Sequence, residues 1–456
     1  MANYPKWGRV AKMKQQELPF EANDRCGGIR KWSRHPAWTH AMRDALSRIR
    51  KACGKWHTLI GRMYDPSLIE AAWNRLDRRI GGPRRRRGAG VDGVTVQRFK
   101  RQAKEEIPRL AQELRSGSYR PRPVRRKEIP KPGSRKTRPL GIPCVRDKVV
   151  QEALRSLIEP IFEAEFLGGS HGFRPERSTE TACRHLEAQL ESGLHWVVDA
   201  DVRNCFGEIE HAKLLDAVNA RIADGKVLNL IRAFLKAGVM KETGYSDSVK
   251  GTPQGGVVSP LLCNVFLHGL DLRCEEKGLG WVRYADDILL LCRTREEAES
   301  ALQWLTEVLT EMGLSLSPEK TSVTSVDDGF DFLGWHYEET RRWPRRKGEL
   351  ALRFRLREKT RRNRPGSMGQ ICAEVTPILR GWSNYFKEGN SLYSFADMES
   401  WLRRRLRSIL HKRRKGRGMS TLGQNSRWPN DRFLSWGFFE PSEALKRYRH
   451  RYSRSP

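Results

Sequence analysis

The sequence predicts an α+β fold, in which a mixed sheet with its helices occupies the middle of the chain and a basic helical region follows. First, helical and strand-like segments alternate through the middle: "VRDKVVQEALRSLIEPIFE" has the apolar spacing of an amphipathic helix, and "LHWVVDADV" that of a buried strand. Second, the chain becomes helical and more basic beyond roughly residue 346. Third, its 456 residues, 38% of them hydrophobic, are enough for two or three domains with sizeable cores.

The charge balance indicates a polyanionic partner. The formal net charge is +32, and Arg-rich runs alternate with 14 Trp and other aromatic residues. Cations and stacking rings together favour nucleic acid, with an acidic membrane surface as the alternative. No apolar stretch approaches the length of a membrane span, so we expect no membrane crossing.

The N-terminus and the cysteines indicate an intracellular, cytoplasmic protein. The first residues, "MANYPKWGRVAKMKQQELPF", lack the apolar core of a secretion signal. The nine Cys are isolated and form no C-x-x-C pair, so neither a zinc site nor a disulfide framework is expected. Cys205, Cys263 and Cys292 lie in apolar stretches and are expected to be reduced core residues.

The N-terminal third contains a helix and two cationic segments. In "YDPSLIEAAWNRLDRRI", Asp65 can cap a helix that begins at Pro66. The following "GGPRRRRGAG", 81–90, reads equally well as a solvated charge run or as a phosphate contact. Residues 119–143 mix Pro, Gly and cations around short β-like pieces, which predicts an irregular hairpin whose cations face outward.

Two segments carry carboxylates where strands end. "VRYADDILLL" predicts a hairpin with Asp286 and Asp287 at or beside its turn, and Asp199 and Asp201 lie on one face of the strand "HWVVDADV". Carboxylates converging from two strands suit a hard cation such as Mg²⁺. Nucleotidyl transfer uses two such ions about 3.5–4 Å apart. The alternative is that Asp286 and Asp287 only make a polar turn.

Several motifs, in order, resemble those of the reverse transcriptases encoded by group II introns, also called intron maturases. The resemblance runs from about Leu59 to Gly389. It includes "GAGVDG", "KPGSRKTRPLGIP", "GGSHGFRPERST", "VVDADVRNCFGEIEH", "GTPQGGVVSPLLCNVFL", "YADD", "LSLSPEKT", "FDFLGW" and the thumb-like "TPILRGWSNYFKEGN". It implies a right-hand polymerase with fingers and palm, followed by a helical thumb or maturase domain.

The resemblance also implies the catalytic and metal-binding residues. It makes Asp201 the first metal ligand, assisted by the main-chain carbonyl of Val202, and Asp286 the second ligand, with Asp287 as its neighbour in the signature. All three carboxylates are expected to be catalytic and to hold Mg²⁺. Phe206 matches an aromatic steric gate that excludes a 2′-hydroxyl and so selects deoxynucleotides. Core packing is the alternative for Phe206.

The nucleotide pocket follows from the same resemblance. Lys131 and Arg138 match cations that grip the triphosphate. Gln254 and Gly255 match pocket residues, with glycine permitting close approach of the backbone. Gly207 departs from the family, which usually has Asp after the gate aromatic, but that Asp is not a metal ligand. Asp199 matches a looser position and is left out of the catalytic set.

Arginines in two segments are expected to contact nucleic acid. Arg174 lies in the motif that resembles the template-contacting loop. The segment "WLRRRLRSILHKRRKGRG", 401–418, predicts a helix with an apolar stripe for docking, made by Leu402, Leu406, Ile409 and Leu410. Beside this stripe lie Arg403, Arg404 and Arg405, with Arg407, where they could reach phosphates. A solvated basic face is the alternative.

These observations divide the chain into four expected parts. Residues 1–60 are a basic segment without an assigned role, 61–345 form fingers and palm, 346–418 form the thumb or maturase domain, and 419–456 are a short basic tail. The tail lacks the Cys and His pairs of the endonuclease domain found in many relatives, as in the branch that includes bacterial class C introns.

The resemblance implies RNA-directed DNA synthesis together with splicing assistance. The expected partners are the group II intron RNA, an RNA template with a DNA primer, target DNA and dNTPs. One alternative is a domesticated enzyme acting in DNA repair or phage defence without an intron. Another is a binding-only maturase with a decayed active site, against which the intact "YADD", Asp201 and Phe206 argue.

Overall fold

The computed structural model describes residues 54–80, 88–130, 137–241, 244–246, 250–253, 255–416 and 427–452. Several sequence-based expectations lie outside these ranges: the basic segment over 1–53, the arginine run within 81–87, Lys131, Gln254, and the tail at 417–426 and 453–456. The chain forms two compact units, Met1–Val323 and Thr324–Pro456.

A bundle of helices begins the first unit. It contains α3 (Ile60–Met63), α4 (Pro66–Ile80), α5 (Val96–Ser116) and α6 (Val145–Glu163). The Asp65 carboxylate accepts a hydrogen bond from the Ser67 amide at 2.9 Å, as expected for a residue that starts α4. The bundle encloses part of one continuous apolar core, which includes Leu59, Ile69, Leu110 and Leu154.

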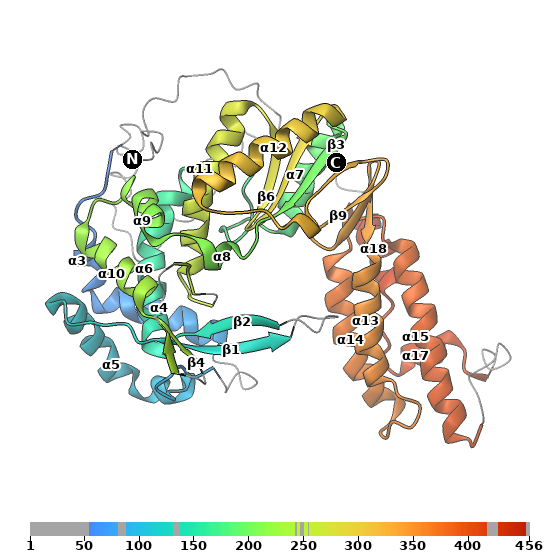
Figure 1. The fold of residues 1–456 in the computed structure, drawn as a ribbon. Coiled ribbons are helices and arrows are strands. Elements are labelled where there is room, and N and C mark those ends of the chain that lie inside the picture. The colour runs from blue at the N-terminus through green and yellow to red at the C-terminus, as the bar shows by residue number, and fades with distance from the viewer. Residues whose placement is uncertain are drawn as a thin grey trace. The chain divides into compact units, whose positions relative to one another are not determined.

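A four-stranded fingers sheet adjoins these helices, in the order β2-β1-β4-β5. It contains β1 (Val124–Pro130), β2 (Thr137–Ile142), β4 (Val239–Lys241) and β5 (Gly244–Ser246). β1 and β2 form the hairpin that the sequence predicts, but as a regular antiparallel ladder rather than irregular loops (Figure 1). Most of β1 and the first half of β2 are exposed, so Arg126, Lys127 and Arg138 face outward or lie near the surface.

A second four-stranded sheet, here called the palm sheet, carries the predicted carboxylates, in the order β6-β7-β3-β8. It contains β3 (Trp196–Asp201), β6 (Gly280–Tyr284), β7 (Asp287–Cys292) and β8 (Ser322–Ser325), with the 3-10 helix η2 (Pro318–Lys320) just before β8. The helices of this region are α7 (Thr179–Glu191), α8 (Cys205–Glu208), α9 (His211–Asn219), α10 (Gly225–Lys236), α11 (Ser259–Lys277) and α12 (Arg295–Met312). Helix α12 packs along β3 and β7 (Figure 1), which buries the strands' apolar side chains.

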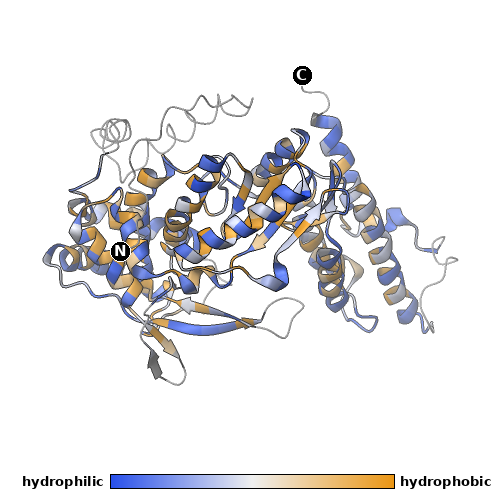
Figure 2. Ribbon diagram, turned by 45° about the horizontal axis from the view of Figure 1, so that its top comes forward, coloured by the Kyte–Doolittle hydropathy of each residue, from blue (hydrophilic) through white to orange (hydrophobic). Residues whose placement is uncertain are grey.

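The second unit is mainly helical. A small antiparallel sheet comes first, made by β9 (Phe330–Phe332), β10 (Trp335–Glu338) and β11 (Arg341–Pro344). The helices are α13 (Arg346–Lys359), α14 (Met368–Tyr385), α15 (Leu392–Arg413), α17 (Asn430–Ser435) and α18 (Pro441–Tyr452). They enclose a separate apolar core that includes Leu356, Leu379, Leu402 and Phe433, and hydrophobic colour recurs along these helices in Figure 2. The start of α13 at Arg346 agrees with the change of composition seen there.

The predicted α+β class is confirmed by the two mixed regions and the helical unit after them. Cys205, Cys263 and Cys292 are buried and free, as expected, with the Cys205 and Cys263 sulfurs 3.8 Å apart. None of the helices that the structure describes has both the length and the apolar character that crossing a bilayer requires.

Candidate active site

Three carboxylates lie at one end of the palm sheet. Asp201 is the last residue of β3, and its backbone is paired with that of Asp287, the first residue of β7. The β6–β7 hairpin closes at Tyr284 and Asp287, so Ala285 and Asp286 form its two-residue turn. Directly opposed residues on neighbouring strands project to the same face, so the hairpin brings the Asp201 and Asp287 side chains to one side.

The Asp201 carboxylate already has cationic and hydroxyl partners. Its Oδ2 accepts hydrogen bonds from Lys320 Nζ at 2.7 Å and from Ser317 Oγ at 2.9 Å. The Asp201 carbonyl also accepts the Ser317 amide at 2.8 Å, which ties the segment before η2 to the end of β3. Sequence reasoning did not assign Ser317 or Lys320 to the site, although both lie in the motif "LSLSPEKT".

The site has an excess of negative charge in a partly buried place. Burial raises the pKa of Asp286, and repulsion by Asp201 raises it further, whereas Arg138 and Lys320 lower it. A cation bound between the carboxylates would relieve the repulsion that raises this pKa.

The donor set fits a hard divalent cation. Carboxylate and main-chain carbonyl oxygens are the ligands that Mg²⁺ prefers, and an ammonium group lies 2.7 Å from Asp201 Oδ2. Within the described ranges, no group of three or more His, Cys, Asp or Glu side chains could hold a metal ion. A metal here would therefore need ligands besides carboxylates, such as a main-chain carbonyl, water or the phosphates of a nucleotide.

Phe206 lies on the short helix α8, which follows the end of β3. Its half-buried ring packs against the main core and meets Phe173 edge to face, with ring centroids 6.3 Å apart and planes at 84°. Phe173 is 54% exposed. The Phe206 carbonyl accepts the Thr252 amide at 2.6 Å, which holds the start of the "TPQGG" loop against α8.

Gly255 connects this loop to the fingers sheet. Its φ is +114°, and a Cβ at this position would lie 2.4 Å from the carbonyl oxygen of Gly141 in β2. A side chain would therefore separate the loop from the strand that carries Arg138. Among the expected pocket residues, Gly255 thus contacts β2, Arg138 lies on that strand, and Phe206 packs against the core and Phe173.

Arg174 does not lie where the sequence suggested. Its side chain is 5% exposed, and all five of its N–H donors are used inside the protein. The Glu163 carboxylate accepts from Nε and Nη2, and the acceptors of the other hydrogen bonds are the carbonyls of Leu167, Ser170 and Phe166. The expectation of a nucleic-acid contact is corrected, because this guanidinium has no donor left for a phosphate.

The arginines of α15 also need correction. The apolar stripe is confirmed, since Leu402, Leu406 and Ile409 are fully buried. Arg403 Nη1 donates to Glu440 at 2.8 Å, and Arg405 Nε donates to Thr360 Oγ1 at 2.8 Å. Both guanidiniums therefore connect helices of the second unit rather than project freely.

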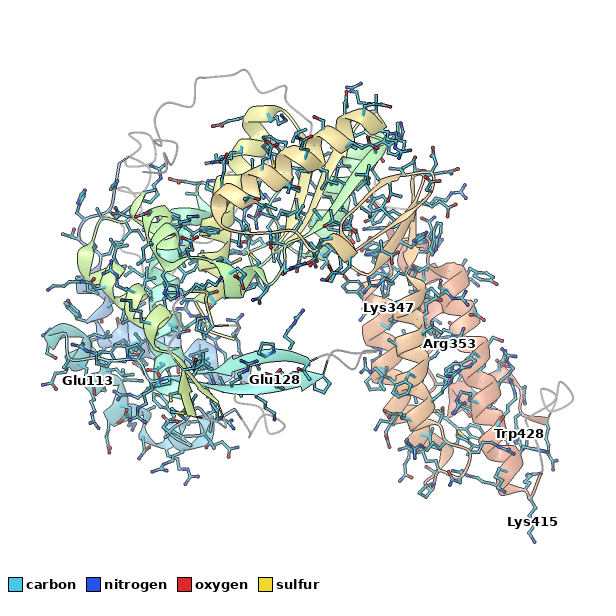
Figure 3. The ribbon with its side chains drawn as sticks, in the orientation of Figure 1. Glu113, Glu128, Lys347, Arg353, Lys415 and Trp428 are labelled. Carbon is cyan, nitrogen blue, oxygen red and sulfur yellow. The ribbon has the colours of Figure 1, made fainter. Side chains whose placement is uncertain are left out.

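Two further arginines of α15, Arg404 and Arg407, differ in their exposure to solvent. Arg407 is buried and donates to the carbonyl of Trp428 at 2.9 Å (Trp428 is labelled in Figure 3). Arg404 is exposed. Of Arg403, Arg404, Arg405 and Arg407, Arg404 is the one that faces solvent.

Comparison with known proteins finds two family models that match this chain. Residues 129–337 match the reverse transcriptase (RNA-dependent DNA polymerase) family, and residues 350–428 match the group II intron maturase-specific domain. The first range contains the palm sheet and the three carboxylates, and so defines the class as reverse transcriptases. The chain belongs to the group II intron-type reverse transcriptases that carry a maturase domain, which confirms the resemblance and its fingers-and-palm fold.

Two relatives illustrate this membership. Protein YkfC of Escherichia coli K12 is 34% identical over 325 residues, covering 63% of this chain and 84% of that protein. The group II intron-encoded protein LtrA of Lactococcus lactis subsp. cremoris is 32% identical over 342 residues, covering 60% of this chain. The match covers 56% of LtrA, so the chain spans about half of that relative's length.

The chain also aligns with solved structures. The chain aligns with a partial Cas6-RT-Cas1–Cas2 complex at 22% identity and a TM-score of 0.36, covering 56% of this chain and 42% of that chain. A TM-score this low adds nothing to the assignment.

Proposed function

We propose that this protein is an RNA-directed DNA polymerase whose site is built on Asp201, Asp286 and Asp287. The observation that carries the proposal is that Asp201, at the end of β3, lies next to the turn that holds Asp286: the Val202 amide donates to the Asp286 carbonyl at 3.4 Å, and Lys320 supplies positive charge to Asp201. A site of this charge can hold cations and the phosphates of an incoming dNTP.

Asp201, Asp286, Asp287 and the Val202 carbonyl would hold Mg²⁺. When bound, two such ions activate the attacking oxygen and neutralise charge on the leaving phosphates. The protein's own groups bind and orient: Ser317 fixes the rotamer of Asp201 through its 2.9 Å hydrogen bond, and the β6–β7 turn fixes Asp286.

The nucleotide would lie between the fingers and the palm sheet. Arg138, with Lys131, would grip its triphosphate, because a guanidinium fork and an ammonium both suit phosphate oxygens. Gln254 and Gly255 would line the pocket, and the Phe206 ring would leave no room beneath the sugar for a 2′-hydroxyl. This arrangement would select dNTPs.

The partner we propose is the RNA of a group II intron. The maturase match over residues 350–428 and the net charge of +32 support binding to structured RNA, and so splicing assistance. Reverse transcription of that RNA at a DNA target would then be retrohoming. The proposal places this activity in the cytoplasm, where the gene and the intron RNA meet.

The alternative is a domesticated enzyme without an intron. The DNA that flanks the gene separates the two possibilities. A catalytic intron RNA fold around the gene, spliced faster in the presence of the protein, supports the intron assignment. Flanking DNA without such a fold supports the alternative.

Primer extension tests the polymerase proposal. The full chain should extend a DNA primer on an RNA template in the presence of Mg²⁺. Asp286→Asn keeps the side-chain shape but removes a charged ligand, and should lower extension by about a thousandfold or more. Asp199→Asn is the matched control, because Asp199 lies two residues before Asp201 on the same strand face.

The control variant should keep at least about a tenth of wild-type activity. Far-UV circular dichroism and melting temperature check that each variant is folded. Extension by Asp286→Asn close to the wild-type rate would overturn the assignment.

A further inference from the structure

Arg283 lies in β6, two residues before the turn that carries Asp286, and its side chain is 0% exposed. It donates to both carboxylate oxygens of Asp271, at 2.6 Å each. Nη1 donates to Asn264 Oδ1 at 3.0 Å and to the Ala285 carbonyl at 3.1 Å, and Nη2 donates to Ser170 Oγ at 2.8 Å. All five N–H donors of the guanidinium therefore have partners.

One of these partners lies in the catalytic turn itself. Ala285 has φ of +60°, a left-handed conformation that costs a residue other than glycine about 1–2 kcal/mol. Its carbonyl receives the Arg283 hydrogen bond, and Asp286 is the next residue. The guanidinium thus holds the strained residue that determines where the Asp286 carboxylate points.

The other partners connect the turn to two further segments. Asp271 and Asn264 belong to α11, so the turn is fixed to a long buried helix. Ser170 belongs to the 168–178 loop. This loop is bound to β6 by the Arg283 amide, which donates to the Gly169 carbonyl at 2.8 Å, and by the His171 amide, which donates to the Arg283 carbonyl at 2.9 Å.

The same loop contacts the turn directly. A Cβ on Gly172 would lie 2.3 Å from the Ala285 nitrogen, so only glycine permits this approach. Asn264 Nδ2 donates to the Gly172 carbonyl at 2.7 Å, while Asn264 Oδ1 accepts from Arg283. The loop, the turn and α11 therefore form one hydrogen-bonded unit centred on Arg283.

Stability alone is a poor explanation for this arrangement. A buried ion pair often contributes no more to folding than apolar side chains of equal volume, because both charges lose their hydration. A planar guanidinium with five hydrogen bonds does, however, fix the geometry of the backbone that it contacts. The benefit of the arrangement lies in precise placement of the turn.

We propose that Arg283 is a positioning residue that sets the metal-binding geometry of Asp286 by fixing the Ala285–Asp286 turn to α11 and to the 168–178 loop. The inference rests on the proposed polymerase function. It requires that loosening Arg283 should weaken divalent-cation binding and slow catalysis more than it weakens nucleotide binding.

Arg283→Lys tests this role, because lysine keeps the charge but cannot make the five bonds. Arg155→Lys is the matched control: Arg155 is also bound to mostly buried carboxylates, those of Glu152 and Glu159, but lies on α6. Mn²⁺ binding to the full chain is measured by electron paramagnetic resonance. Extension at varied Mg²⁺ and dNTP concentrations gives the Mg²⁺ half-saturation, kcat and KM.

Arg283→Lys should raise the Mn²⁺ Kd and the Mg²⁺ half-saturation by about tenfold and lower kcat, with KM for dNTP within about twofold. Arg155→Lys should lower the melting temperature without changing either metal value beyond about twofold. If Arg283→Lys lowers the melting temperature as Arg155→Lys does and leaves Mn²⁺ binding unchanged, Arg283 is only a stabilising residue and the proposal is overturned.

Ser170→Ala decides the matter if Arg283→Lys does not fold. This variant removes one acceptor and leaves the Asp271 pair intact. A weaker Mn²⁺ affinity then supports the proposal, and an unchanged affinity overturns it. Wild-type protein that binds Mn²⁺ but extends no primer overturns the polymerase function instead, so the two failures are distinguishable.

Discussion

At the scale of single residues, two aromatic rings contact each other: Phe206 of α8 and Phe173 of the 168–178 loop. Phe206 is half-buried against the core, and Phe173 covers it edge to face from the exposed side. A ring in such a place can both pack and contact a ligand, so its position alone does not separate a steric gate from a core residue. Only a change in sugar selectivity separates these roles.

We expect Phe206→Val to open space beneath the sugar. Incorporation of ribonucleotides relative to deoxynucleotides should then rise by about tenfold or more, because a smaller side chain no longer excludes the 2′-hydroxyl. Extension is compared with each nucleotide class at matched enzyme concentrations. Phe173→Ala, which alters the outer ring, should keep wild-type selectivity. Unchanged selectivity in Phe206→Val would assign Phe206 to the core.

At the scale of elements, the start of α6 is hydrogen-bonded to the segment that leads into the β1–β2 hairpin. The buried Asp147 accepts hydrogen bonds from the Tyr119 hydroxyl at 2.6 Å and from the Arg122 amide at 3.1 Å. Burial raises the pKa of Asp147 to about 6, because the charged form loses its hydration. The folded protein therefore holds this proton to a higher pH than the unfolded chain.

We therefore expect the free energy of unfolding to depend on pH. The stabilisation is complete below the unfolded pKa near 3.8 and is lost as pH rises through about 6, a change of about 3 kcal/mol. Asp147→Asn cannot titrate at this position. Relative to this variant, the free energy of unfolding of the wild type should therefore decrease by about 3 kcal/mol between about pH 4 and about pH 7. Denaturant unfolding at both pH values checks it. A constant difference would contradict a raised pKa.

On helix α15, we expect substitutions of neighbouring arginines to have different effects on RNA binding and on stability. Arg404→Gln should weaken RNA binding and reduce its salt slope by about one, with no change in melting temperature, because Arg404 is exposed. Arg404→Lys keeps the charge and should keep the slope. Arg403→Gln and Arg405→Gln should instead destabilise the second unit by about 1–3 kcal/mol each, because they remove partners of Glu440 and Thr360.

RNA filter binding over a salt series, paired with thermal melts, separates the two effects. If Arg404→Gln leaves both affinity and slope unchanged, α15 offers no phosphate contact at this residue. If Arg403→Gln lowers affinity at an unchanged melting temperature, the Glu440 pair is not its main role.

At the scale of the whole molecule, periodicity and motif order predicted the α+β class, the β6–β7 hairpin and α15. These features depend on local patterns of apolar and turn-forming residues, which a sequence displays directly. Lys320 and Ser317 were missed because their contacts with Asp201 span 119 and 116 residues. Arg174 was misassigned for a related reason, because the role of an arginine depends on which acceptors the fold places near it. Glu163 and three main-chain carbonyls accept all the hydrogen bonds that the Arg174 guanidinium can donate.

Asp201 and Asp286 are proposed to form one site for RNA-templated DNA synthesis. Single-turnover addition of one dNTP to a DNA primer on an RNA template, with Mg²⁺ varied, tests it most directly. The wild type should add the nucleotide in a Mg²⁺-dependent manner. The addition rate should fall by about a thousandfold or more in Asp201→Asn and in Asp286→Asn. The double variant should add the nucleotide no more slowly than either single variant, because the carboxylates act together. Near-wild-type addition by either folded single variant would contradict the claim.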